Sequence, residues 1–182
     1  MQLHALLSFA PLLAMLSVAA AIDLRSRRIP NWLTLMIATT GTMQAFLSAA
    51  TVTPLQSILG LLVGGLLSFA LFAIGGRGGG DVKLLAAAGA WTGVTLIFYV
   101  FVVAALFEMV LALAQCGAQG RLRTLFRNTA VLAVNIAHAK ELGEAHLDAA
   151  GIASSSAGRP LPYAVSVLAA MLVLLVRGTG VA

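Results

Sequence analysis

Long apolar runs with very few charges are the feature that most constrains what this chain can fold into. Asp, Glu, Lys and Arg make up only 9% of its 182 residues, whereas an average soluble domain has roughly a quarter. Apolar residues reach 60%, so the polar residues are too few to coat one soluble core. This composition excludes disorder and a soluble enzyme with an ordinary charged surface, and it predicts a membrane protein. The single cysteine, Cys116, excludes an internal disulfide and a multi-cysteine zinc site.

We expect about six transmembrane helices, because a spanning helix requires about 20 mainly apolar residues. The apolar segments are residues 3–22, 32–49, 55–74, 84–115 and 161–176. The segment 84–115 is too long for one span and short for two, so we divide it near residues 89–93, with a full helix beginning near Val94. The first segment is interpreted as a retained span rather than a signal peptide, because basic residues follow it and none precedes it. The predicted fold is an all-α, polytopic helical bundle that forms a single membrane domain over residues 1–182.

Residues 116–160 form a more polar connector within this domain. Their middle part mixes Arg with Leu, Phe and Val, so an interfacial helix on anionic lipid and an ordinary solvated loop both remain open. His138 and His146 are separated by too many residues to match a common zinc-ligand spacing, which favours the solvated loop over a metal site.

The basic residues predict the orientation in the membrane. Six crossings place segments 23–31, 75–83 and 116–160 on one side, and these segments contain every Lys and Arg except Arg177. Because loops rich in Lys and Arg remain on the cytoplasmic side, this side is predicted to face the cytoplasm and both termini to lie outside.

Two acidic residues are predicted to meet at this cytoplasmic boundary. Asp23 ends the first span and Asp81 opens the fourth, and the two crossings between them return the chain to the same side. Acids at the edge of an apolar segment are costly to desolvate, so a functional role is the first hypothesis, with helix capping as the structural alternative.

A glycine-rich stretch precedes Asp81. Residues 75–83 read Gly-Gly-Arg-Gly-Gly-Gly-Asp-Val-Lys, and glycine allows backbone conformations and close approaches that other residues do not. A phosphate-binding loop is not indicated, because the stretch lacks the Gly-Lys-Ser/Thr ending and a preceding soluble strand. The stretch instead predicts a flexible or extended backbone that can present a peptide to the carboxyl of Asp81.

The sequence around both aspartates resembles a known family. Residues 78–83 resemble the GxGD motif of intramembrane aspartyl proteases. Asp23, followed by Arg-Ile-Pro-Asn at residues 28–31, resembles the first-aspartate region of prepilin peptidases. With its small size and the positions of both acids, the chain is most similar to the short branch that processes Flp-type pilins of tight-adherence systems.

This resemblance implies an inner-membrane aspartic endopeptidase of bacteria. Its partners would be membrane lipid and a prepilin or pilin-like precursor, whose short basic leader it cleaves at the cytoplasmic face; no nucleic acid is expected. Asp23 and Asp81 would be catalytic, one ionised to activate a water and one protonated to donate to the carbonyl oxygen. This mechanism requires no metal and no cofactor. Longer relatives also N-methylate the new terminus, but this chain has no room for their cysteine-rich insert between Asp23 and Trp32, so methyltransferase activity is not expected.

Four further residues are candidates for supporting roles. Gly78 and Gly80 belong to the motif. Lys83 either tunes the two acids or serves only the orientation in the membrane, and the second interpretation is favoured. Glu108 lies inside an apolar segment, where an acid usually faces the protein interior and has a partner, so a place near the active centre and a structural hydrogen bond both remain open.

Some patterns leave alternatives open. Gly60, Gly64 and Gly65 form a GxxxG pattern, which fits either a homodimer or close packing inside the monomer. The aromatic residues Trp91, Phe98 and Tyr99 are predicted to anchor the outer membrane interface rather than to line a ligand cage. The main functional alternative is a small proton- or ion-coupled transporter that uses its acids as a relay, and a second is an inactive scaffold. A transporter would be expected to show polar positions across the whole bilayer and an internal repeat, and the sequence contains neither.

Overall fold

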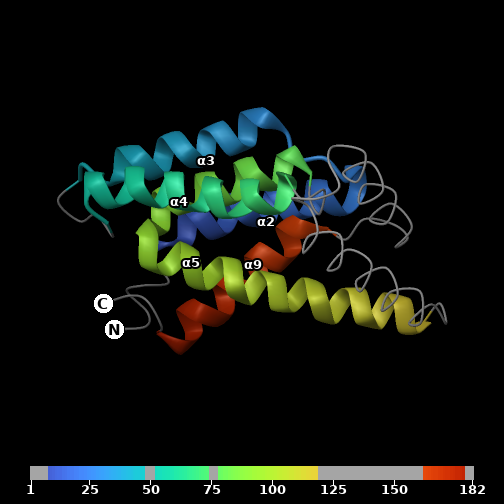
Figure 1. Ribbon diagram of the computed structural model, residues 1–182. Coiled ribbons are helices and arrows are strands. Elements are labelled where there is room, and N and C mark those ends of the chain that lie inside the picture. Colours follow the sequence, from blue (N-terminus) through green and yellow to red (C-terminus); the bar gives the residue numbers. More distant parts are fainter. Residues whose placement is uncertain (1–7, 48–51, 74–77, 119–161, 179–182) are drawn as a thin grey trace, which may run out of the picture.

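The computed structural model describes residues 8–47, 52–73, 78–118 and 162–178, and all regular structure in these ranges is α-helical. The helices pack side by side as a bundle (Figure 1). They are α2 (Ala10–Ser26), α3 (Asn31–Gln44), α4 (Pro54–Ala73), α5 (Gly79–Ala118) and α9 (Tyr163–Arg177). The predicted all-α class is confirmed for these parts of the chain.

Helix α5 consists of two limbs that fold back on each other at Gly93. Gly93 has φ 70° and ψ −176°, a conformation that favours glycine. In a straight helix Leu85 and Ile97 would be about 18 Å apart. However, a Cβ atom on Gly64 would lie 2.6 Å from the carbonyl oxygen of Leu85 and 3.1 Å from Cγ1 of Ile97. Limb 1 (residues 79–92) and limb 2 (residues 94–118) therefore run in opposite directions, which confirms the predicted break near residues 89–93.

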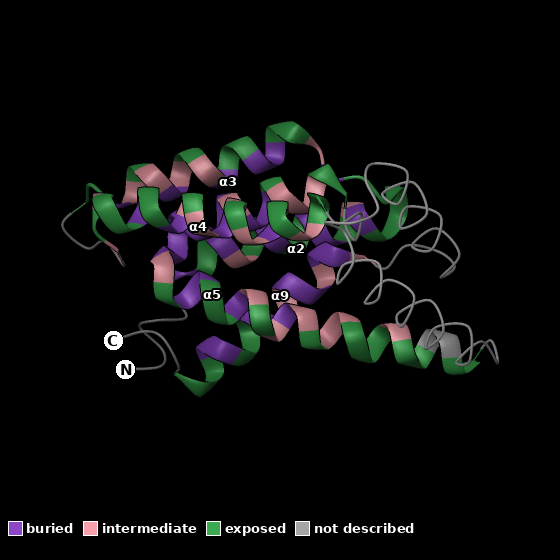
Figure 2. Ribbon diagram, viewed as in Figure 1, coloured by how far each residue is buried: buried purple, intermediate pink, exposed green. Residues whose placement is uncertain are grey.

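The outer surface of the bundle is apolar. Figure 2 shows exposed residues along the outward sides of α3 and α4, and these include Leu35 at 65%, Met43 at 71% and Leu66 at 69% exposure. Exposed apolar side chains on this scale are unusual for a monomeric soluble protein and normal for one surrounded by lipid.

Only some of the helices have the length expected of a membrane span. Within the described residues, Pro54–Ala73 and Gly79–Ala114 are long and apolar enough to cross a membrane. The second of these is divided at Gly93, so limb 2 is its longer continuous part. Helix α9 is a shorter apolar helix, and α2 and α3 have 17 and 14 residues in the part that the structure describes. Six transmembrane crossings therefore stay a prediction.

The GxxxG pattern packs within the chain. The buried residues of α4 are Ser57, Gly60, Gly64 and Ser68, spaced by one helical turn. A Cβ atom on Gly60 would collide with the carbonyl oxygen of Gly89, so α4 and limb 1 approach to backbone contact. This face of α4 is therefore covered by α5, and the pattern gives no support to a homodimer.

The prediction that Trp91 anchors the membrane interface is wrong. Its side chain is only 5% exposed, and its indole N–H donates a hydrogen bond of 2.9 Å to the carbonyl oxygen of Ile37. Gly41 leaves the space for the indole ring, because a Cβ atom there would clash with it. The polar group of Trp91 is thus satisfied inside the bundle, whereas Phe98 and Tyr99 are about half exposed and pack edge to face.

Replacing Gly60 by alanine should destabilise the bundle. The added methyl group meets the backbone of Gly89, which cannot rotate away, so we expect a loss of at least about 1–3 kcal/mol of unfolding free energy. Thermal unfolding of the detergent-purified protein measures the loss. Gly65→Ala on the same helix is the control, because its Cβ atom would meet only Cβ of Ala86 at 3.4 Å. Equal stability of the two variants would contradict this packing.

Candidate active site

Asp23 lies at the end of the buried stripe of α2. Leu12, Leu16 and Ala19 occupy the preceding turns of this stripe and are fully buried, so the helical repeat directs Asp23 into the bundle. Asp23 is 6% exposed, and its Oδ2 accepts a hydrogen bond of 3.1 Å from the backbone N–H of Ala164. That N–H belongs to the first turn of α9, where the helix dipole favours a negative group.

A four-residue connection joins α2 to α3 beside this carboxyl. Arg27 has a left-handed conformation, φ 53°, and its N–H bonds to the carbonyl oxygen of Asp23 at 2.9 Å, which ends α2. Pro30 has an extended conformation before the first turn of α3. Between them, Ile29 is buried and faces Gly80. A Cβ atom added to Gly80 would lie 3.6 Å from the Cβ atom of Ile29. The connection therefore brings the end of α2 to the start of α5.

Asp81 occupies the first turn of α5, which begins at Gly79, so the prediction of a flexible or extended backbone is wrong from Gly79 to Lys83. Its Oδ2 accepts a hydrogen bond of 3.3 Å from the backbone N–H of Gly78, the residue just before the helix. This contact satisfies one of the N–H groups that a helix leaves unpaired at its start, and an acid there is favoured by the helix dipole. The side chain is half-buried, so Asp81 combines a helix-capping contact with partial access to solvent or substrate.

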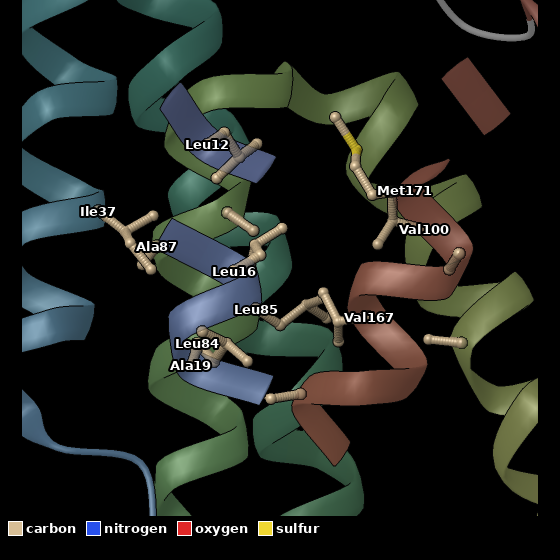
Figure 3. Close-up of a cluster of buried hydrophobic side chains, with 14 of the residues drawn as sticks. Leu12, Leu16, Ala19, Ile37, Leu84, Leu85, Ala87, Val100, Val167 and Met171 are labelled. Atoms are coloured by element: carbon tan, nitrogen blue, oxygen red, sulfur yellow. The ribbon is translucent and has the colours of Figure 1, made fainter. Parts of the chain in front are cut away.

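The helical register brings both aspartates to the same end of the bundle. Figure 3 shows Ala19 of α2 level with Leu84 of limb 1, while Ala87 lies further toward the opposite end. One turn beyond Ala19 is Asp23, and one turn before Leu84 is Asp81, on the stripe that faces the core. The structure therefore places the two acidic residues at one end of the bundle, and the shared cytoplasmic boundary and the catalytic roles stay predictions.

Lys83 strengthens this junction. Its ammonium group donates a hydrogen bond of 3.1 Å to the side-chain oxygen of Asn31, which links limb 1 to the first residue of α3. The side chain of Lys83 is exposed, as are those of Arg25 and Arg28, whereas the exposed Arg177 ends α9 at the other end of the bundle. Basic side chains thus surround the end that carries the two aspartates.

Glu108 lies on limb 2, whereas Asp81 lies on limb 1. It is half-buried and follows Phe107, which packs against the buried core. Limb 2 continues to Ala118, so Glu108 is about 15 Å from its end along the helix axis. A supporting role for Glu108 stays a prediction. The predicted connector, residues 116–160, lies outside the described residues beyond Ala118, and so do both of its histidines.

Sequence reasoning missed the contribution of α9. The group that binds Asp23 is a backbone N–H, and a backbone donor has no signature in the amino-acid sequence. Pro162 just before the helix marks the helix start, a position where unpaired N–H groups are expected, but nothing in the sequence pairs it with Asp23.

The described part of the chain is an apolar helical bundle that carries two acidic residues at one end. The chain belongs to the type IV leader peptidase family, whose family model matches residues 10–113. The matched region runs from the start of α2 into limb 2 and includes Asp23 and Asp81, but it ends before α9. No curated protein and no solved structure matches the chain.

The contact between Asp23 and α9 predicts different stabilities for two variants. Asp23→Asn keeps a side-chain oxygen that can accept the N–H of Ala164, whereas Asp23→Leu has the same branching at Cγ, a larger side chain and no acceptor. We expect the leucine variant to be less stable than the asparagine variant by about 1–3 kcal/mol, the cost of a buried unpaired donor. Thermal unfolding in detergent compares them, and a leucine variant as stable as the asparagine variant would argue against this hydrogen bond.

Proposed function

We propose that this chain is an aspartic endopeptidase that removes the basic leader from pilin or pilin-like precursors. The observation that carries the proposal is the arrangement of Asp23 and Asp81. Both lie within the region that matches the type IV leader peptidase family, and the contacts of Gly80 with Ile29 and of Lys83 with Asn31 support a place for both at one end of the bundle. Family membership also favours a peptidase over the ion-coupled transporter that the isolated acids left open.

Two neighbouring carboxyls suffice for peptide hydrolysis. One, ionised, accepts a proton from a water molecule as the water oxygen attacks the scissile carbonyl carbon. The other, protonated, donates to the carbonyl oxygen as its negative charge develops. The C–N bond then breaks, the amine nitrogen takes up a proton, and a new carboxylate and a new amine are released. Two carboxyls close to each other favour sharing one proton, so one of them can be ionised while the other is protonated. Asp23 and Asp81 can each fill either role.

The basic side chains at the end of the bundle that carries Asp23 and Asp81 support a cytoplasmic active site. Arg25, Arg28 and Lys83 are exposed at the end that carries the aspartates. The positive-inside rule assigns such an end to the cytoplasmic face. A precursor with a basic leader and an apolar stem would then meet the two carboxyls at the membrane boundary, before its stem.

The short connection between α2 and α3 supports cleavage without methylation. Helix α2 ends at Ser26 and α3 begins at Asn31, so the chain has no cytoplasmic domain between them. This is the position of the cysteine-rich insert in longer relatives. We therefore propose the short, tight-adherence branch of the family, in the bacterial inner membrane.

Replacing either aspartate by asparagine should abolish processing. Asp23→Asn and Asp81→Asn each preserve the shape of the side chain but remove a group that accepts or donates a proton. The rate of cleavage should therefore fall by about a hundredfold to ten-thousandfold. Each variant is co-expressed with a tagged Flp-type precursor that has a basic leader, and the mature form is quantified on a gel.

Asp148→Asn serves as the control, because Asp148 lies outside the matched family region. This variant should cleave the precursor as the parent protein does. Membrane fractionation checks that every variant is inserted. Full processing by either catalytic variant would refute the two-aspartate mechanism, and tolerance of both substitutions would instead favour a scaffold.

A further inference from the structure

A buried serine on α4 lacks a hydrogen-bond partner among the residues that the structure describes. Ser68 is 0% exposed, and its Oγ makes no hydrogen bond there. Exposed serines behave differently, since Ser17 and Ser26 donate to carbonyl oxygens of their own helix at 2.7 and 2.9 Å. The hydroxyl of Ser68 has the same option and does not use it. A buried hydroxyl without a partner is costly, so this group is expected to have a partner in the working protein.

The packing of α4 against limb 1 identifies the residue across from Ser68. Gly60 contacts the carbonyl of Gly89, and Gly64 contacts that of Leu85. Each step of four residues forward on α4 therefore corresponds to four residues backward on limb 1. Ser68 lies one step beyond Gly64, and Asp81 lies one step before Leu85.

Both residues belong to regular helix at this level. Helix α4 continues beyond Ser68 to Ala73, and α5 begins at Gly79, so the register extends to this pair without a break. At the other end of the same contact, Ser57 shows what such a serine can do, because its hydroxyl donates to the carbonyl oxygen of Ala90 across the interface at 2.7 Å.

We propose that Ser68 is a positioning residue that donates its hydroxyl proton to the carboxyl group of Asp81. In this structure Oδ2 of Asp81 bonds to the N–H of Gly78. A second donor from α4 fixes the rotation of the carboxyl and holds it toward the core face that it shares with Asp23. The catalytic part of this proposal rests on the proposed function, whereas the hydrogen bond itself does not.

A spectroscopic test detects the hydrogen bond without any substrate. The full-length protein is labelled with carboxyl-¹³C aspartate, and the signal of Asp81 is assigned by its loss in Asp81→Asn. Ser68→Ala should move this signal, because the carboxyl loses a donor. Ser57→Ala should leave it unchanged, since Ser57 is equally buried on the same helix but bonds at the distant end. An Asp81 signal that does not move in Ser68→Ala overturns the proposal.

Kinetics then test the positioning role. With a purified Flp-type precursor, Ser68→Ala should lower kcat about tenfold with little change in KM, because a misaligned carboxyl impairs the chemical step rather than binding. Ser57→Ala should lower thermal stability but keep kcat. Unchanged kcat in Ser68→Ala would overturn the positioning role. If the parent protein cleaves no precursor while the Asp81 signal still moves, the proposed function fails and the Ser68–Asp81 contact stands.

Discussion

Backbone contact between α4 and the first limb of α5 is the constraint on which the rest of the structure depends. Gly60 and Gly89 have no side chains, so the two helices approach more closely than any larger residue would allow. Gly93 then reverses the chain, and the second limb packs against the same helix. This contact fixes the register of limb 1, and it thereby determines which end of the bundle carries the glycine-rich motif and Asp81.

Helix ends supply the polar groups of the candidate site. Asp23 reaches the start of α9, and Asp81 caps the start of its own helix, so backbone N–H groups that a helix leaves unpaired bind each carboxyl. In an apolar bundle with few polar side chains, such N–H groups are partners that the helices themselves provide. The matched family region ends before α9, so the partner of Asp23 comes from a part of the chain that the family motif does not include.

The sequence predicted the features that depend on local chemistry. The break near Gly93 follows from the length of the apolar segment and its glycines, and the shared end for Asp23 and Asp81 follows from the count of spans. The kink at Gly93 and the contacts of Gly80 with Ile29 and of Lys83 with Asn31 agree with them. The interior position of Trp91 was missed, because a tryptophan near a span end fits an interface equally well until the space left by Gly41 is known. The N–H of Ala164 was also missed, because its pairing depends on how α9 packs and not on any side chain.

Thiol cross-linking tests the central claim, that Asp23 and Asp81 face one another in a single site, most directly. In a Cys116→Ala background, the paired variant Asp23→Cys and Asp81→Cys is treated in membranes with a short bifunctional thiol reagent. We expect the reagent to cross-link this pair within one chain. It should not cross-link Leu12→Cys with Asp81→Cys, because these two positions lie at opposite ends of the bundle. Failure of the first pair to cross-link, with both cysteines shown to react singly, would contradict the two-aspartate site.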